Sequence, residues 1–355
     1  MSTLPLFKLP FLCINEILIN MDIISLVSLS LVSRRCQRIV KLVKTKLTGF
    51  NIQIKESGIE LLFVDSQRIL GYWIFEPEKK ENRGSGDMEM RSRAGNGLAV
   101  RAHYLLEKSI TFHANLIRSY HSEEDIQQSM KLGLDYLRDL FKKPINKFYL
   151  HPDGLPECPL QIELKECNEL LVKGKKAMKD EYLKSILETI IVKTKCTLWI
   201  PINPTFECNT NLLKFKELKC VEYEGCGHWI TRNVFLNLKC THMQLYHSLL
   251  EADAVMSFFE RWFHSDDTEF HVLVVQTDKL FDGLNFDRFQ PKPWNPEQRS
   301  RHFLYSSTMA YDCSTGIDII RSDGLLCTVY MTNGCALFGV WHDRFPDVSG
   351  VSQIA

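Results

Sequence analysis

The sequence predicts a mixed α/β protein, in which a small N-terminal helical module precedes a much larger domain. This larger domain is an irregular, leucine-rich-repeat-like succession of strands and helices with antiparallel meanders at its two ends. Three observations predict this class. Residues 9–46 carry only helical periodicity, apolar runs alternate with amphipathic helices over residues 147–276, and glycine-containing turns join short apolar runs at both ends of the larger domain.

Composition limits the kind of protein that this can be. The 355 residues include 43 Lys and Arg and 43 Asp and Glu, so the formal net charge is zero. No long-range field therefore directs the protein to nucleic acid or to a membrane surface, and neither is expected as a partner. Hydrophobic residues make up 45% of the chain, which excludes a mainly disordered protein.

The apolar stretches and the cysteines indicate the compartment. No stretch approaches the roughly 20 apolar residues that span a bilayer, and polar residues interrupt the apolar N-terminus where a signal peptide would need a continuous core. The 12 cysteines are spread along a long chain. They are therefore interpreted as reduced thiols of an intracellular protein, located in the cytoplasm, the nucleus or both.

The helical module begins at Leu9-Pro10, because the first turn of a helix tolerates proline. Two apolar periods follow, and the second begins at Leu26. Their members are Ile14, Ile17, Leu18 and Met21, then Leu26, Leu29, Val32, Cys36, Ile39, Val40 and Val43. So small a module cannot bury a continuous stripe by itself, so it is expected to dock on a partner.

The larger domain opens with a meander of three strands, at residues 51–55, 59–65 and 69–75. Residues 76–97 lose apolar periodicity and collect charge and glycine, which predicts a flexible loop. A helix then begins at Ser122, with Glu123, Glu124 and Asp125 in its first turn, and ends at Lys142-Lys143-Pro144.

Strands and helices alternate in the middle of the chain. The strands are expected at residues 147–151, 169–172, 197–202, 220–224, 241–246 and 270–276. The spacing of the later ones, about 20 to 30 residues, is typical of solenoids with one strand per repeat, although no strict leucine-rich consensus recurs. The chain closes with strands at 317–321, 325–331 and 335–341, joined by Asp-Gly and Asn-Gly turns, and a loop is expected at 291–303.

No common enzyme signature occurs in the sequence. The strongest metal candidate is a cluster of Cys226, His228, Cys240 and His242. Residues i and i+2 of a strand share a face, so each Cys-x-His pair could present two ligands to one zinc ion. The spacing differs from that of known zinc motifs, and cysteines in half-buried strands are commonly inert core residues.

The N-terminal residues resemble an F-box. The resemblance is carried by Leu9-Pro10, Glu16-Ile17-Leu18, Met21-Asp22, Leu26, Leu29-Ser30-Leu31, Val32-Ser33-Arg34-Arg35 and Ile39-Val40. It covers about a tenth of the chain and agrees in the spacing of apolar positions through three helices. Cys36 departs from the pattern, since many F-boxes have tryptophan near this position.

The rest of the chain resembles the F-box-associated (type 2) region of a greatly expanded nematode family. The motifs that carry this looser resemblance are Phe148-Tyr149-Leu150-His151-Pro152 with Gly154, Thr197-Leu198-Trp199-Ile200-Pro201, Asp318-Ile319-Ile320-Arg321 with Asp323-Gly324, and Val340-Trp341-His342.

The two resemblances imply the substrate-receptor subunit of an SCF-type ubiquitin ligase. An F-box at residues 5–46 would bind a Skp-type adaptor and, through it, a cullin, while residues 50–355 would recruit a protein substrate. Such a subunit has no catalytic residue and no cofactor. The expected adaptor contacts are Leu9, Pro10, Ile14, Ile17, Leu18, Met21, Leu26 and Leu29.

Two alternatives remain open at this point. One is a zinc protein or a small-molecule enzyme that uses the cluster of Cys226, His228, Cys240 and His242. The other is a repeat scaffold, unconnected with ubiquitin, whose N-terminal helices bind a different helical partner.

Overall fold

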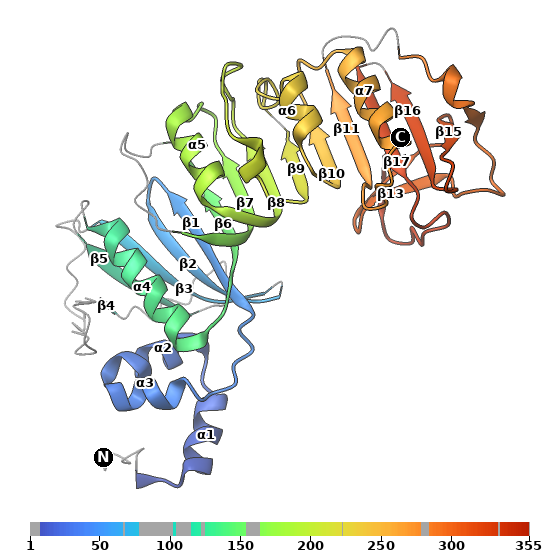
Figure 1. The fold of residues 1–355 in the computed structure, drawn as a ribbon. Coiled ribbons are helices and arrows are strands. Elements are labelled where there is room, and N and C mark those ends of the chain that lie inside the picture. The colour runs from blue at the N-terminus through green and yellow to red at the C-terminus, as the bar shows by residue number, and fades with distance from the viewer. Residues whose placement is uncertain are drawn as a thin grey trace. The chain divides into compact units, whose positions relative to one another are not determined.

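The computed structural model describes residues 8–66, 68–77, 102–103, 115–121, 125–153, 164–221, 223–277, 284–332 and 334–354. The chain divides into two compact units, Met1–Asn168 and Glu169–Ala355 (Figure 1). Most of the loop predicted at 76–97 lies outside the described residues, as do Ser122, the predicted start of a helix, and Gly154.

Unit 1 begins with the three helices α1 (Phe11–Ile19), α2 (Ile23–Val32) and α3 (Arg34–Val40). The Asp22 side chain caps α2 by accepting a hydrogen bond from the Ser25 N–H. The backbone of Ser33 is extended, and its side chain caps α3 by accepting from the Cys36 N–H. The apolar period predicted to continue from Leu26 to Val43 is therefore divided at Ser33 between two helices.

The predicted meander is present as β1 (Gly49–Lys55), β2 (Gly58–Asp65) and β3 (Arg68–Pro77). Two parallel strands extend it, β6 (Ile145–Leu150) beside β1 and β5 (Asn115–His121) beside β3, and β4 (Ala102–His103) pairs with β5. The helix α4 (Ile126–Phe141) packs on this sheet. It ends at Lys142, whose φ of 52° is in the left-handed region.

Contacts within unit 1 join the N-terminal helices to α4 and to the sheet. The Tyr136 hydroxyl on α4 donates a hydrogen bond of 2.7 Å to Ser30 Oγ on α2. The Lys41 ammonium lies 2.6 Å from the Asp139 carboxylate, also on α4. The helix α2 also packs against β3 and β5. Part of the apolar stripe expected to require a partner is thus covered by the chain itself.

Unit 2 contains most of β7 and all of the next four strands in the order β7-β8-β9-β10-β11, and β8 to β11 are parallel. The bounds of these strands are Glu166–Lys173, Ile191–Trp199, Glu217–Cys220, His242–Leu245 and Val272–Gln276. The connections contain α5 (Asp180–Thr189), α6 (Arg232–Asn237) and α7 (Ala252–Phe263), together with the short 3-10 helix η3 (Thr210–Leu212). The three α-helices lie on one face of the sheet (Figure 1).

The closing meander consists of β15 (Ile317–Ile320), β16 (Leu326–Thr332) and β17 (Cys335–Val340). It continues the parallel sheet, because β17 pairs antiparallel with β11. A second sheet of β13 (His302–Ser306), β14 (Met309–Asp312) and β18 (Ser352–Ile354) packs against it through a shared apolar cluster that includes Phe303, Val274 and Trp341.

Several sequence boundaries were wrong. The loop expected at 291–303 contains β12 (Lys292–Pro293), which pairs with β15, and the start of β13; the 3-10 helix η4 (Asp287–Phe289) precedes it. The strand expected at 197–202 begins at Ile191, and the one expected at 220–224 ends at Cys220. The exposed Lys193 and Thr194 interrupt the apolar run near the start of β8, so its alternating pattern is weak.

Candidate functional site

The eight residues expected to contact an adaptor lie at different depths in the N-terminal helices. Ile14, Leu18 and Leu26 are buried. Ile17 is 41% exposed. Pro10 is also exposed, and the remaining three residues, Leu9, Met21 and Leu29, are half-buried. The periodicity identified the apolar face of the helices. Its buried members, Ile14, Leu18 and Leu26, hold the helices together and are not accessible at their surface.

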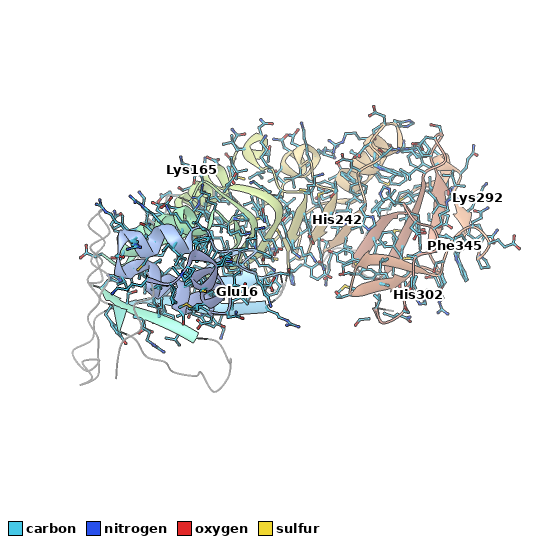
Figure 2. The ribbon with its side chains drawn as sticks, turned by 90° about the horizontal axis from the view of Figure 1, so that it is seen from below. Glu16, Lys165, His242, Lys292, His302 and Phe345 are labelled. Atoms are coloured by element: carbon cyan, nitrogen blue, oxygen red, sulfur yellow. The ribbon has the colours of Figure 1, made fainter. Side chains whose placement is uncertain are left out.

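The sequence reasoning included Ile17 but missed three more exposed apolar residues on α1. We call Phe11, Leu12, Ile17 and Ile19 the α1 patch; Leu12 is 77% exposed and Phe11 is 55% exposed. Glu16, labelled in Figure 2, is an exposed polar residue of the same helix. The signal for the patch was the composition of α1, whose apolar residues exceed what one buried face can hold.

The proposed zinc cluster is not supported by the geometry. The Cys226 thiol donates to the Tyr246 carbonyl at 3.5 Å, and the Cys240 thiol donates to the Phe215 carbonyl at 3.7 Å. Burial raises the pKa of Cys226 to about 11 and that of Cys240 to about 12, so both are protonated near neutral pH. Across the part of the chain that the structure describes, no group of three or more Cys, His, Asp or Glu side chains could hold a metal ion.

These thiols predict a specific alkylation pattern. Because the thiolate is the reactive form, Cys226 and Cys240 should react slowly with iodoacetamide at about pH 8, whereas the exposed Cys13 should react fast. Labelling of Cys226 should rise as the pH approaches its pKa of about 11. Mass spectrometry of the alkylated peptides measures each rate. Fast labelling of Cys226 at about pH 8, or labelling that increases only when a metal chelator is added, would contradict this interpretation.

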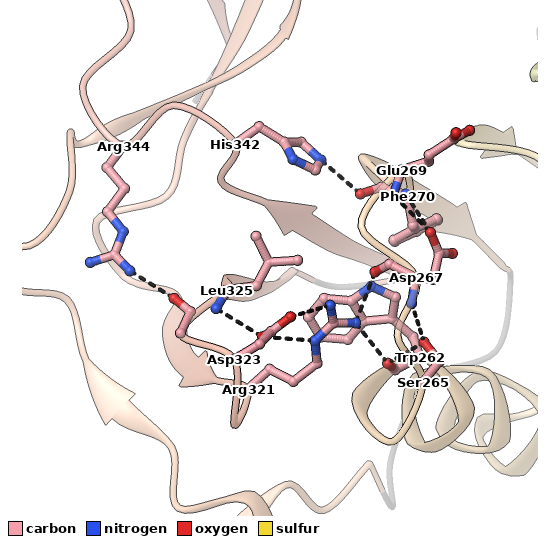
Figure 3. Close-up of polar contacts among 11 residues, drawn as sticks. Trp262, Ser265, Asp267, Glu269, Phe270, Arg321, Asp323, Leu325, His342 and Arg344 are labelled. Atoms are coloured by element: carbon pink, nitrogen blue, oxygen red, sulfur yellow. Dashed lines mark hydrogen bonds and ion pairs between the residues drawn. The ribbon is translucent and has the colours of Figure 1, made fainter.

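The motif of Arg321 and Asp323 forms a structural clamp, which Figure 3 shows. The Arg321 guanidinium donates to the Asp323 carboxylate at 2.6 and 3.0 Å and lies 5.0 Å from the centre of the Trp262 ring. It also donates to the backbone carbonyls of Trp262 and Asp267. The hydrogen bonds from Arg321 hold the pKa of Asp323 down at about 2. The clamp therefore ties the end of α7 to the closing meander.

A second charged pair is buried in unit 2. Nε of Arg299 donates to both oxygens of Asp318, at 2.9 and 3.0 Å, and neither side chain is more than 2% exposed. The Thr328 hydroxyl also donates to Asp318, and it accepts a hydrogen bond from the Trp341 indole. The motif residues Asp318 and Trp341 thus form a hydrogen-bonded core, which positions the closing strands rather than a substrate.

The comparisons with known proteins identify the N-terminal helices. The F-box domain model matches residues 6–48. Over nearly its whole length the chain is similar to two Caenorhabditis elegans proteins. It is 22% identical to "Uncharacterized protein F59B2.8" (99% of this chain and 81% of that protein) and 20% identical to "Uncharacterized protein F59B2.9" (96% and 80%). No solved structure matches the chain significantly.

An F-box domain indicates in general terms which partner a protein binds. F-box domains bind Skp-type adaptors within SCF complexes, and the proteins that carry them generally serve as non-catalytic substrate receptors. The match covers α1, α2 and α3 and includes the whole α1 patch. Among the described helices, none is both long and apolar enough to cross a membrane.

Proposed function

We propose that this protein is the substrate receptor of an SCF-type ubiquitin ligase. The observation that carries the proposal is the F-box match at residues 6–48, on helices that present an exposed apolar patch. A Skp-type adaptor bound there would connect the chain to a cullin. Residues 50–355 would recruit a protein substrate, as the resemblance to an F-box-associated (type 2) region with irregular leucine-rich-type repeats implies.

The adaptor contacts can be assigned by depth. Pro10, Ile17 and the other members of the α1 patch are accessible, so they would meet the adaptor directly. Leu9, Met21 and Leu29 would lie at the margin of the contact. Ile14, Leu18 and Leu26 are buried and would fix the angles between the helices. The residues at the centre of such an apolar contact supply most of its binding energy.

The mechanism needs no catalytic side chain in this chain. A receptor that holds a substrate near a ubiquitin-loaded conjugating enzyme raises the effective concentration of substrate lysines. The geometry of tethering, rather than acid-base chemistry, would then set the rate. This division of labour assigns adaptor binding to residues 5–46 and substrate binding to residues 50–355.

The test is direct binding of a purified Skp-type adaptor to the full chain. Leu12→Asp places a charge at the most exposed member of the α1 patch and should weaken adaptor binding by at least about thirtyfold, the effect of losing one hot-spot residue. The double change Leu9→Ala with Pro10→Ala should also weaken it. Isothermal titration calorimetry measures the affinities, and circular dichroism checks that each variant is folded.

A matched control separates this effect from a general loss of stability. Leu249→Asp makes the same change at a leucine of unit 2 that is 51% exposed, and it should leave adaptor binding unaltered. If the unmodified chain does not bind the adaptor, the scaffold alternative replaces this proposal. Equal weakening by both leucine variants would also count against it.

A further inference from the structure

One face of the parallel sheet in unit 2 carries polar side chains. Cys196, Leu218 and Met243 are fully buried members of β8, β9 and β10. The residues that precede them point to the opposite face, because side chains alternate along a strand. Lys195 pairs with Glu217 in register, and Glu217 pairs with His242, so these three form a row across the strands. His242 is labelled in Figure 2.

Three lysine ammoniums lie along this face. The Glu217 carboxylate lies 3.3 Å from the Lys195 ammonium and 3.2 Å from that of Lys219, so two cations share one anion. A third ammonium, that of Lys173, lies 4.5 Å from the centre of the Trp199 ring. Burial lowers the pKa of Lys219, which identifies a cation held partly out of water. We call Lys173, Lys195, Glu217 and Lys219 the lysine strip.

A pocket of about 290 Å³ adjoins the strip. Three imidazoles line it: the His242 and His271 rings are 4.6 Å apart between centres, and those of His271 and His342 are 5.5 Å apart. Phe303 and Trp341 contribute further aromatic walls. We call it the imidazole pocket. Its volume is at the lower end of the range for ligand sites, so it suits one side chain rather than a cofactor.

Two of the three imidazoles are uncharged near neutral pH, although the Asp343 carboxyl also lines the pocket. Burial lowers the pKa of His271 to about 4, and the neighbouring His242 contributes to that shift. Burial also lowers the pKa of His242. The His242 and His271 imidazoles are therefore neutral at pH 7 and present flat rings to an occupant. A planar aromatic side chain is the group that packs best among such rings.

The strip and the pocket are continuous with each other. Glu217 of the strip pairs in register with His242 of the pocket. Lys219 Nζ lies 5.0 Å from the centre of the ring of Tyr305, which lines the pocket and donates a hydrogen bond to Gln244. A single extended segment could thus contact both features.

We infer that this face of unit 2 binds an acidic peptide segment of a partner protein, with an aromatic side chain of that segment in the imidazole pocket. Charge complementarity with the lysine strip supports an acidic occupant. A peptide fits better than a nucleic acid, because a peptide can place an uncharged residue opposite Glu217, whereas a phosphodiester chain carries a charge at every unit. The binding itself is independent of the F-box; that the partner is a ubiquitination substrate rests on the proposed function.

The test uses the full chain and a synthetic probe. The probe is a fluorescein-labelled peptide of about ten residues, in which Glu or Asp alternates with Ser around one central Phe. Its length is enough to cross strands spaced at about 4.8 Å. Fluorescence anisotropy should give saturable binding. Replacing the Phe of the probe by Ala, or Lys195 of the protein by Glu, should each weaken binding about tenfold.

Matched controls define the site. Lys216→Glu makes the same charge change at a lysine that is 66% exposed and paired with Glu269, outside the strip, and should have little effect. Ser307→Trp fills the mouth of the pocket and should abolish the advantage of Phe over Ala in the probe. Thr308→Trp, at the adjacent exposed position that does not line the pocket, should preserve it.

Several results would overturn the inference. They are the absence of saturable binding, equal weakening by Lys195→Glu and Lys216→Glu, and tighter binding of a single-stranded RNA of the same charge. Adaptor binding by the same preparations distinguishes the two proposals. Lys195→Glu should bind the adaptor normally, and Leu12→Asp should bind the probe normally, so failure of one assay leaves the other proposal intact.

Discussion

Replacing Arg299 with Met is expected to lower the free energy of unfolding of unit 2 by about 3–5 kcal/mol, because it leaves the buried Asp318 carboxylate without its cation. Arg299 is fully buried and also donates to the backbone carbonyls of Ser300 and Cys313. Those acceptors would lose their partner in the same step. Urea unfolding measures the loss of unfolding free energy, and hydrogen exchange of unit 2 peptides tests whether the loss occurs in this unit.

The control lies two residues along the chain. Arg301 pairs with Asp312, but its side chain is 57% exposed, so water and salt screen the pair. Arg301→Met should leave the unfolding midpoint nearly unaltered. If Arg299→Met and Arg301→Met behave alike, the buried pair does not have the structural role assigned to it. A double-mutant cycle of Arg299→Met, Asp318→Asn and the variant with both changes then measures how strongly Arg299 and Asp318 are coupled.

Replacing Trp73 with Ala should have a comparable effect on unit 1, about 3–5 kcal/mol. Trp73 on β3 is fully buried, stacks on Phe75 at 5.2 Å between ring centres, and donates its indole N–H to the buried Ser119 hydroxyl. Gly133 of α4 packs closely over this pair, since a Cβ there would lie 2.8 Å from the Phe75 ring. The substitution leaves a cavity and removes a hydrogen bond from Ser119.

Because the chain has two compact units, the two variants should affect different regions. Trp73→Ala should increase hydrogen exchange in β1, β2 and β3 while the exchange of β15, β16 and β17 stays as in the unmodified chain. Tyr72→Ala, at the adjacent half-buried position on the same strand, should cost less. Exchange that rises equally in both units after Trp73→Ala would show that they unfold together.

Local signals predicted much of the secondary structure. Leu9-Pro10, the closing Asp-Gly turn and the end of α4 before Lys142-Lys143-Pro144 each lie where the sequence predicted them. Such features depend on neighbours in sequence, which pattern analysis can see. The F-box resemblance implied three helices, but the periodicity missed the division at Ser33, because a serine that caps a helix resembles any other polar residue of a helical period in the sequence.

Features that depend on distant residues were harder to predict. The sheet of β13, β14 and β18 brings residues 302–312 beside residues 352–354, and no local sequence pattern predicts that pairing. The zinc hypothesis was wrong for the same reason. The two Cys-x-His pairs have the same spacing in the sequence, but the Cys226 and Cys240 thiols donate hydrogen bonds to the carbonyls of two different residues, Tyr246 and Phe215. Conversely, the pairing of Glu217 with both Lys195 and Lys219 became visible only once β8 and β9 lay side by side.

The bonds that join α2 and α3 to α4 limit how freely this module can be exchanged between proteins. Residues 9–46 transplanted alone would leave behind the Tyr136 hydroxyl and the Asp139 carboxylate, to which Ser30 and Lys41 are joined. A chimera that preserves these helices in their native surroundings should include the chain to residue 168. The compact unit to which these helices belong is therefore larger than the matched residues 6–48.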